Sequence, residues 1–181
     1  MEGAKYVCTP PPRDKASQVA CWDGLQQSIF SLFSTDHCPF KYDDPHGKLL
    51  PKGKTSFRWV LNGILGVETR LSILFSESVG KDRIILNKFV VLTSANHAKT
   101  YGLYPKKAPS RSAPMPTSRS GIRCAKRPSR IARCMAVATT QPHEGTTVTG
   151  WPVSTMLRGK FRSARRKTCR QAGRWRLCAA R

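Results

Sequence analysis

The chain has 181 residues, enough for one domain with a core of its own, and a formal net charge of +22. That charge is uneven: residues 1–107 hold 15 Lys and Arg against 9 Asp and Glu, whereas residues 108–181 hold 17 against a single acid, Glu144. No apolar run approaches the roughly 18 residues of a membrane span, and the seven cysteines show no metal-ligand spacing. We therefore expect no membrane partner, reduced thiols and a cytoplasmic location.

The first 35 residues are predicted to form a strand, a helix and a second strand. Lys5–Thr9 is a short strand-like run that ends at three prolines, and Ala16–Leu25 has the apolar spacing of an amphipathic helix. Ile29–Thr35 combines β-branched and aromatic residues, which is typical of a buried strand. This order is a βαβ unit, and such a unit implies parallel strands.

Beyond residue 40 the sequence predicts a long polar loop, three helical segments and then a change of character. Residues 40–60 form the loop, and Val67–Val79, Ile84–Val91 and Ala95–Tyr101 have helical spacing, with Gly102 placed to end the last helix. Residues 108–141 lack apolar periodicity and are predicted to be disordered. A short globular segment, 142–160, then precedes a basic tail, 161–181.

An acid and a histidine, Asp36 and His37, stand at the end of the second predicted strand. Active sites of parallel barrels lie at the carboxyl ends of their strands. A carboxylate in that place can ligate a divalent metal and accept a proton from metal-bound water. Spacing alone leaves open the simpler alternative that Asp36 only caps a loop.

Four segments together resemble the dihydropyrimidinases and hydantoinases, which are cyclic amidohydrolases. They are KYVCTPPPR from residue 5, FSTDHCPF from 33, NGILGVETRLSILFSESV from 62 and LNKFVVLTSANHAKTYGLYPKK from 86. The resemblance covers about residues 3–107 and implies a partial TIM barrel, strands 7 and 8 with the following helices. A complete barrel takes about 250 residues, so it implies a C-terminal fragment whose β-sandwich domain is replaced by the basic region.

The resemblance also implies a site. Asp36 matches the strand-8 aspartate that binds metal and serves as general base, while Thr9 and Asn62 match residues whose backbone groups bind the cyclic amide. Thr9 replaces a Ser, which we expect to be tolerated because main-chain groups do the binding. The family's reaction is hydrolytic ring opening of dihydropyrimidines or hydantoins by a hydroxide that bridges two zinc ions. Complete members form homotetramers, an assembly that we do not expect of this chain alone.

The other zinc ligands of the family are absent from this chain. Its four histidines, at 37, 46, 97 and 143, contain no HxH motif, and the family's carboxylated lysine segment is also missing. One carboxylate cannot hold two metal ions, so we expect the chain alone to be inactive. His37 is predicted to be a structural residue or one that supports the metal ligands, with a direct role left open, and His97 is predicted to be a surface residue.

Three departures from the family pattern are local. Leu61 and Leu65 stand where the relatives have proline, and Ile85 replaces a serine that would cap a helix. Losing such a cap costs about 1 kcal/mol.

Two other functions remain open at this point. The first is that of the non-catalytic, collapsin-response-mediator-type relatives, although Asp36 and the pair Asn62–Gly63 favour the enzyme branch. The second is a basic arm that binds nucleic acid by neutralising phosphates. Aromatic residues that would stack on bases are few in this tail, so nucleic acid is not the expected partner.

Shifted reading frames offer a different explanation of the tail. The relatives continue from GLYPKKG into text such as TIAIGADADIAIWD, and one coding of that text, read one base later, yields residues 108–122 of this chain. PHEGTTVTGWPVSTMLRGK, from residue 142, resembles the family again in the proper frame. We hypothesise frame breaks near Lys107, Gln141 and Lys160, which resequencing of genomic DNA and transcript would test.

Overall fold

The computed structural model describes residues 2–105, 119–128, 142–157, 160–164, 168–171 and 174–177. Its α-helices are α1 (Lys15–Gln26), α2 (Arg70–Glu77), α3 (Leu86–Val90) and α4 (Asn96–Thr100), with a π-helical turn, Val91–Ala95, between the last two. Short 3₁₀ helices span Glu2–Tyr6, Pro51–Lys54, Phe57–Trp59 and Val79–Lys81. The strands are β1 (Arg119–Pro128), β2 (Thr147–Leu157), β3 (Lys160–Ala164), β4 (Thr168–Gln171) and β5 (Arg174–Leu177).

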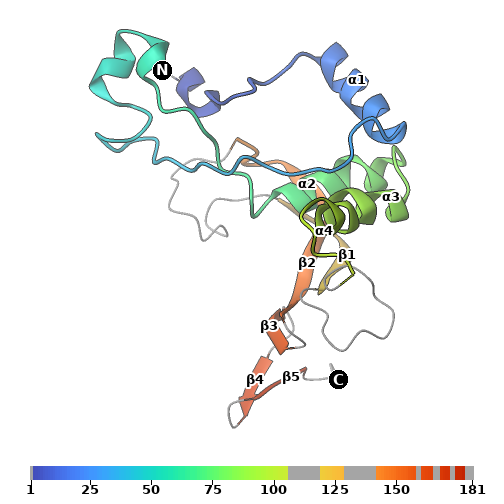
Figure 1. Ribbon diagram of the computed structural model, residues 1–181. Coiled ribbons are helices and arrows are strands. Elements are labelled where there is room, and N and C mark those ends of the chain that lie inside the picture. Colours follow the sequence, from blue (N-terminus) through green and yellow to red (C-terminus); the bar gives the residue numbers. More distant parts are fainter. Residues whose placement is uncertain are drawn as a thin grey trace.

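The hydrophobic core lies where helices α2 and α3 meet the end of α1 (Figure 1). Phe75 of α2 and Phe89 of α3 pack edge to face, with ring centroids 5.4 Å apart and planes at 88°. Leu25, Leu74 and Leu92 are buried beside them. Leu25, Leu74, Phe75 and Phe89 lie in segments predicted to be helical, and these helices are confirmed. Leu92 lies in the π-helical turn that follows the predicted segment Ile84–Val91.

Helices α3 and α4 form one continuous helical run rather than two separate helices. The π-helical turn joins them, and Gly102 follows the last turn, as predicted. At the start of the run, Ile85 occupies the N-cap position and no side chain caps the helix. The start of α3 therefore lacks a side-chain cap, as the sequence predicts.

The two predicted strands, Lys5–Thr9 and Ile29–Thr35, are wrong as secondary structure. Residues 2–6 form a 3₁₀ helix, and residues 31–36 are irregular, so neither a βαβ unit nor strands of a barrel form here. What remains is an isolated parallel bridge between His37 and Ile64. A parallel strand needs a neighbour that satisfies its backbone groups, and within residues 2–105 these two segments find no ladder partner.

The C-terminal strands form two antiparallel sheets, β1-β2-β3 and β4-β5. Strand β2 lies against α2, where Val148 is buried and the Thr149 amide donates to Ser76 Oγ at 3.1 Å. Strand β1 lies within residues 108–141, for which no regular structure was expected, and it pairs along β2 with two register shifts. The predicted globular segment 142–160 contains β2, and β3, β4 and β5 fall mainly within the predicted basic tail 161–181. Residues 106–118, 129–141, 158–159, 165–167, 172–173 and 178–181 lie outside the described residues. No helix of the described ranges is long and apolar enough to cross a bilayer.

Candidate functional site

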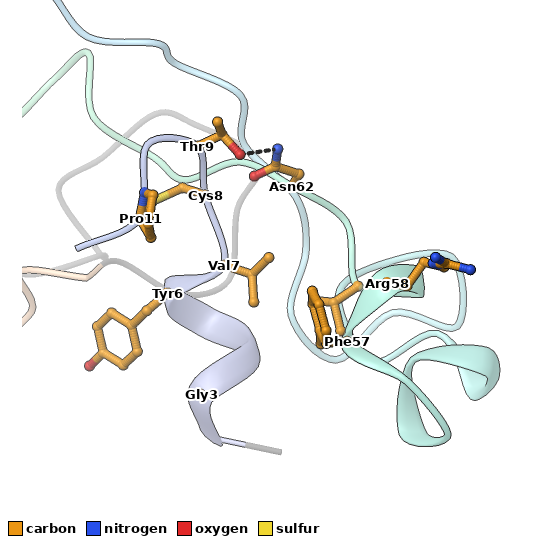
Figure 2. Close-up of a pocket in the computed structure, with 10 residues that line it drawn as sticks. Gly3, Tyr6, Val7, Cys8, Thr9, Pro11, Phe57, Arg58 and Asn62 are labelled. Carbon is orange, nitrogen blue, oxygen red and sulfur yellow. Dashed lines mark hydrogen bonds between the residues drawn. The ribbon is translucent and has the colours of Figure 1, made fainter. Parts of the chain in front are cut away.

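A pocket of about 470 Å³ opens between the N-terminal segment and the chain around Phe57–Asn62 (Figure 2). One wall is formed by residues that flank the three prolines, and the other by the 3₁₀ helix Phe57–Trp59 and the residues after it. The lining residues are Gly3, Tyr6, Val7, Cys8, Thr9, Pro11, Phe57, Arg58, Val60 and Asn62. This volume lies in the range of ordinary small-molecule sites, about 300–1,000 Å³.

Thr9 and Asn62, far apart in sequence, meet at the rim of this pocket. The Asn62 Nδ2 donates a hydrogen bond to Thr9 Oγ1 at 2.8 Å, shown as the dashed line in Figure 2. Both residues are exposed. The structure thus brings together the two residues that the sequence analysis expects to face a substrate.

The backbone behind this contact is held by a close approach at Gly63. Its amide donates to the Val7 carbonyl at 3.0 Å, which ties residues 62–63 to the segment that carries Thr9. Gly63 has φ +154°, and a Cβ there would lie 2.5 Å from the Cys38 carbonyl oxygen. Only glycine fits this place without displacing the chain, so this residue type is required by the packing.

Asp36 lies outside the pocket that contains Thr9 and Asn62. It is exposed, and it immediately precedes the bridge between His37 and Ile64. Of the three predicted site residues, Thr9 and Asn62 therefore line this pocket and Asp36 does not. The bridge, together with the bond from the Cys38 amide to the Ile64 carbonyl at 3.2 Å, places the Asp36 segment beside the Asn62 segment.

His37 is a structural residue in this arrangement, as predicted. Its Nδ1 accepts hydrogen bonds from the backbone amides of Gly66 at 3.1 Å and Val67 at 3.2 Å. The imidazole therefore anchors the turn that leads into α2.

The described residues do not fit a zinc centre. Among them, no three His, Cys, Asp or Glu side chains lie close enough together to hold a metal ion. His97, expected on the surface, is half-buried on α4, and its two ring nitrogens are buried without a partner among the described groups. With Asp36 as the single expected ligand, two zinc ions would need ligands from outside this part of the chain.

Lys48 contacts the N-terminal segment that lines the pocket, and the sequence did not predict its burial. Its side chain is 2% exposed, and its Nζ donates to the carbonyls of Lys5 at 3.1 Å and Val7 at 3.0 Å. Burial lowers the pKa of Lys48 below its ordinary value. A lysine in a polar loop gives no signal of burial, since most such lysines are solvated.

A second pocket, of about 530 Å³, lies between α1, α2 and the residues that lead into β2. Arg83 stacks over the Trp22 ring at 4.7 Å and pairs with Glu77 at 3.6 Å. None of the predicted site residues lines it. This pocket lies where the helices meet the strand, and it shares no lining residue with the pocket of Thr9 and Asn62.

Comparison with known proteins decides the family. A scan of protein families finds no match, but the D-hydantoinase of Geobacillus stearothermophilus is 39% identical over 168 residues, which cover 89% of this chain and 33% of that enzyme. The D-hydantoinase of Rhizobium radiobacter is 38% identical over 107 residues, 59% of this chain and 22% of the relative. The chain is homologous to the D-hydantoinases and dihydropyrimidinases.

The hydantoinase fold also matches the structure of this chain. The D-hydantoinase (dihydropyrimidinase) from Thermus sp. superposes with a TM-score of 0.81 at 30% sequence identity, covering 90% of this chain and 34% of that one. The chain thus spans about a third of the length of the hydantoinases it matches. A match to 89% of the chain necessarily extends past residue 107, so the similarity includes part of the basic region.

Proposed function

We propose that this chain supplies the cyclic-amide-binding segments and the strand-8 acid of a hydantoinase-type cyclic amidohydrolase. In this proposal, residues 5–9 and 29–36 are the counterparts of barrel strands 7 and 8. The contact between Thr9 and Asn62 at the rim of the pocket is the observation that carries it, since the family resemblance predicts that both residues face the substrate.

The chemistry of the pocket suits a cyclic amide. Such a ring offers an N–H donor beside a C=O acceptor, and a peptide backbone presents the complementary pair. The Thr9 hydroxyl and the Asn62 amide bond to one another, so their role is to hold the two backbones at a fixed separation. Main-chain groups then remain to bind the ring, and this is why Thr can replace Ser.

Asp36 would act as the base, but it cannot act in this chain alone. It lies outside the pocket, and the metal ligands that would complete a zinc centre are not among the described residues. We propose that Asp36 reaches the ring only when the two segments are paired with the rest of a barrel. The isolated chain is then expected to bind a cyclic amide without hydrolysing it.

Complementation tests this function. The full chain is assayed with zinc for ring opening of 5,6-dihydrouracil and hydantoin, alone and mixed with the part of the Geobacillus enzyme outside the matched third. We expect hydrolysis only in the mixture, and its loss with Asp36→Asn. Asp82→Asn, which removes an exposed acid far from the pocket, is the matched control and should keep activity. Turnover by the chain alone, or an associated but inactive mixture, would contradict the proposal.

A further inference from the structure

Of the side chains that the structure describes, Lys48 is the charged one that is buried. Removing an ammonium group from water is costly unless hydrogen bonds compensate. Here two backbone carbonyls, of Lys5 and Val7, accept from its Nζ. Both acceptors belong to the segment that leads to Thr9, so the lysine ammonium binds this one segment of the backbone.

A tight turn holds Lys48 at this place. Its own amide donates to the Lys41 carbonyl at 2.9 Å, and the Leu49 amide donates to the Tyr42 carbonyl at 3.1 Å. Gly47 allows the turn to close, because a Cβ on this residue would lie 2.1 Å from the Lys41 carbonyl oxygen. The side chain of Lys48 therefore leaves the loop from a fixed point.

The Val7 carbonyl is shared by two donors, and this joins three segments. It accepts from Lys48 Nζ at 3.0 Å and from the Gly63 amide at 3.0 Å. Thr9 lies two residues after Val7, and Asn62 immediately precedes Gly63. The lysine thus braces the backbone behind the contact between Thr9 and Asn62, without lining the pocket itself.

We propose that Lys48 is a positioning residue, which sets the separation of the Thr9 and Asn62 backbones for cyclic-amide binding. The choice of a cyclic amide as the ligand rests on the proposed function, whereas the role of Lys48 in fixing the two backbone segments does not. A lysine that merely stabilised the fold would act on the whole domain. A positioning lysine acts on residues 5–9 and 62–64 and leaves α2 unchanged.

Hydrogen exchange on the full chain tests the structural half. Lys48→Met keeps the apolar stem and removes the donors, Lys48→Arg keeps charge and donors, and Lys54→Met is a matched change at an exposed lysine of the same loop. Loss of charged hydrogen bonds should speed exchange of the Gly63 amide in K48M by about tenfold, with recovery in K48R. Unchanged exchange at Gly63, or an equal increase along α2, would overturn the proposal.

Ligand-observed NMR with 5,6-dihydrouracil tests the binding half. We expect K48M to weaken binding by about tenfold, and K48R and K54M to bind within about threefold of the unaltered chain. Absence of binding by every variant would refute the proposed function, while the exchange result would still decide the role of Lys48. Equal binding by K48M and the unaltered chain would overturn the positioning role.

Discussion

At the scale of single residues, the site depends on contacts between side chains and distant backbone groups. Thr9 and Asn62 were placed together by resemblance, and the structure joins them at 2.8 Å. Lys48 was missed, because its two acceptors lie more than 40 positions earlier in the chain. Nothing local in the sequence around Lys48 specifies those acceptors. Residue type and spacing could indicate the two rim residues, but not the buried lysine behind them.

A double-mutant cycle measures the rim contact. Thr9→Val removes the acceptor hydroxyl at nearly constant volume, and Asn62→Ala removes the donor. Because the hydrogen bond is exposed, we expect a coupling free energy of about 0.5–1 kcal/mol in urea unfolding. Additive effects of the two substitutions, with no coupling, would show that the bond is not maintained in solution.

At the scale of secondary-structure elements, the predicted helices form, whereas the two strands predicted before residue 36 do not. The apolar positions of α2 and α3 repeat every three or four residues, and this pattern needs only its own backbone to form a helix. The run Ile29–Thr35 has the composition of a strand, but a strand needs a second chain segment beside it. Residues 31–36 find one bond of this kind, from the Phe33 amide to the Leu92 carbonyl at 2.9 Å, and stay irregular.

The start of α3 offers a test at this scale. Ile85 is at the N-cap with φ −73° and ψ 155°, a geometry that serine adopts readily, and its side chain is 72% exposed. Ile85→Ser should raise the free energy of unfolding by about 1 kcal/mol, because the hydroxyl can accept from an unpaired amide of the first turn. Ile85→Ala, which lacks the oxygen, should give no such gain. Urea unfolding of the three chains compares them, and equal stability of the serine and alanine variants would contradict the cap.

At the scale of the whole molecule, several large apolar side chains of the described residues remain exposed. Ile29 is 69% exposed beside backbone that forms no ladder, and Phe57 is 82% exposed at the pocket. Apolar side chains next to unpaired backbone favour association with another chain. The chain spans about a third of its relatives' length.

Self-association of the purified chain is the expected consequence. Ile29→Lys should lower the weight-average mass in sedimentation equilibrium, because a charge on the exposed segment opposes edge-to-edge pairing. Ile85→Lys is the matched control, since it places the same charge at a similarly exposed isoleucine that lies at the start of a helix and not in the irregular segment. A chain that is monomeric before either substitution, or an equal effect of both, would contradict a role of the exposed Ile29 segment in self-association.

The sequence by itself indicated the similarity to the hydantoinases and the positions of the helices, and it predicted Thr9 and Asn62 as site residues, because motif order and helical periodicity are properties of short stretches. Tertiary structure alone decided that the expected strands do not form, that Asp36 does not line the pocket of Thr9 and Asn62, and that Lys48 is buried. The physical reason is common to all three. Strand pairing, the approach of a distant carboxylate and the desolvation of an ammonium depend on which segments become neighbours, and that depends on the whole chain.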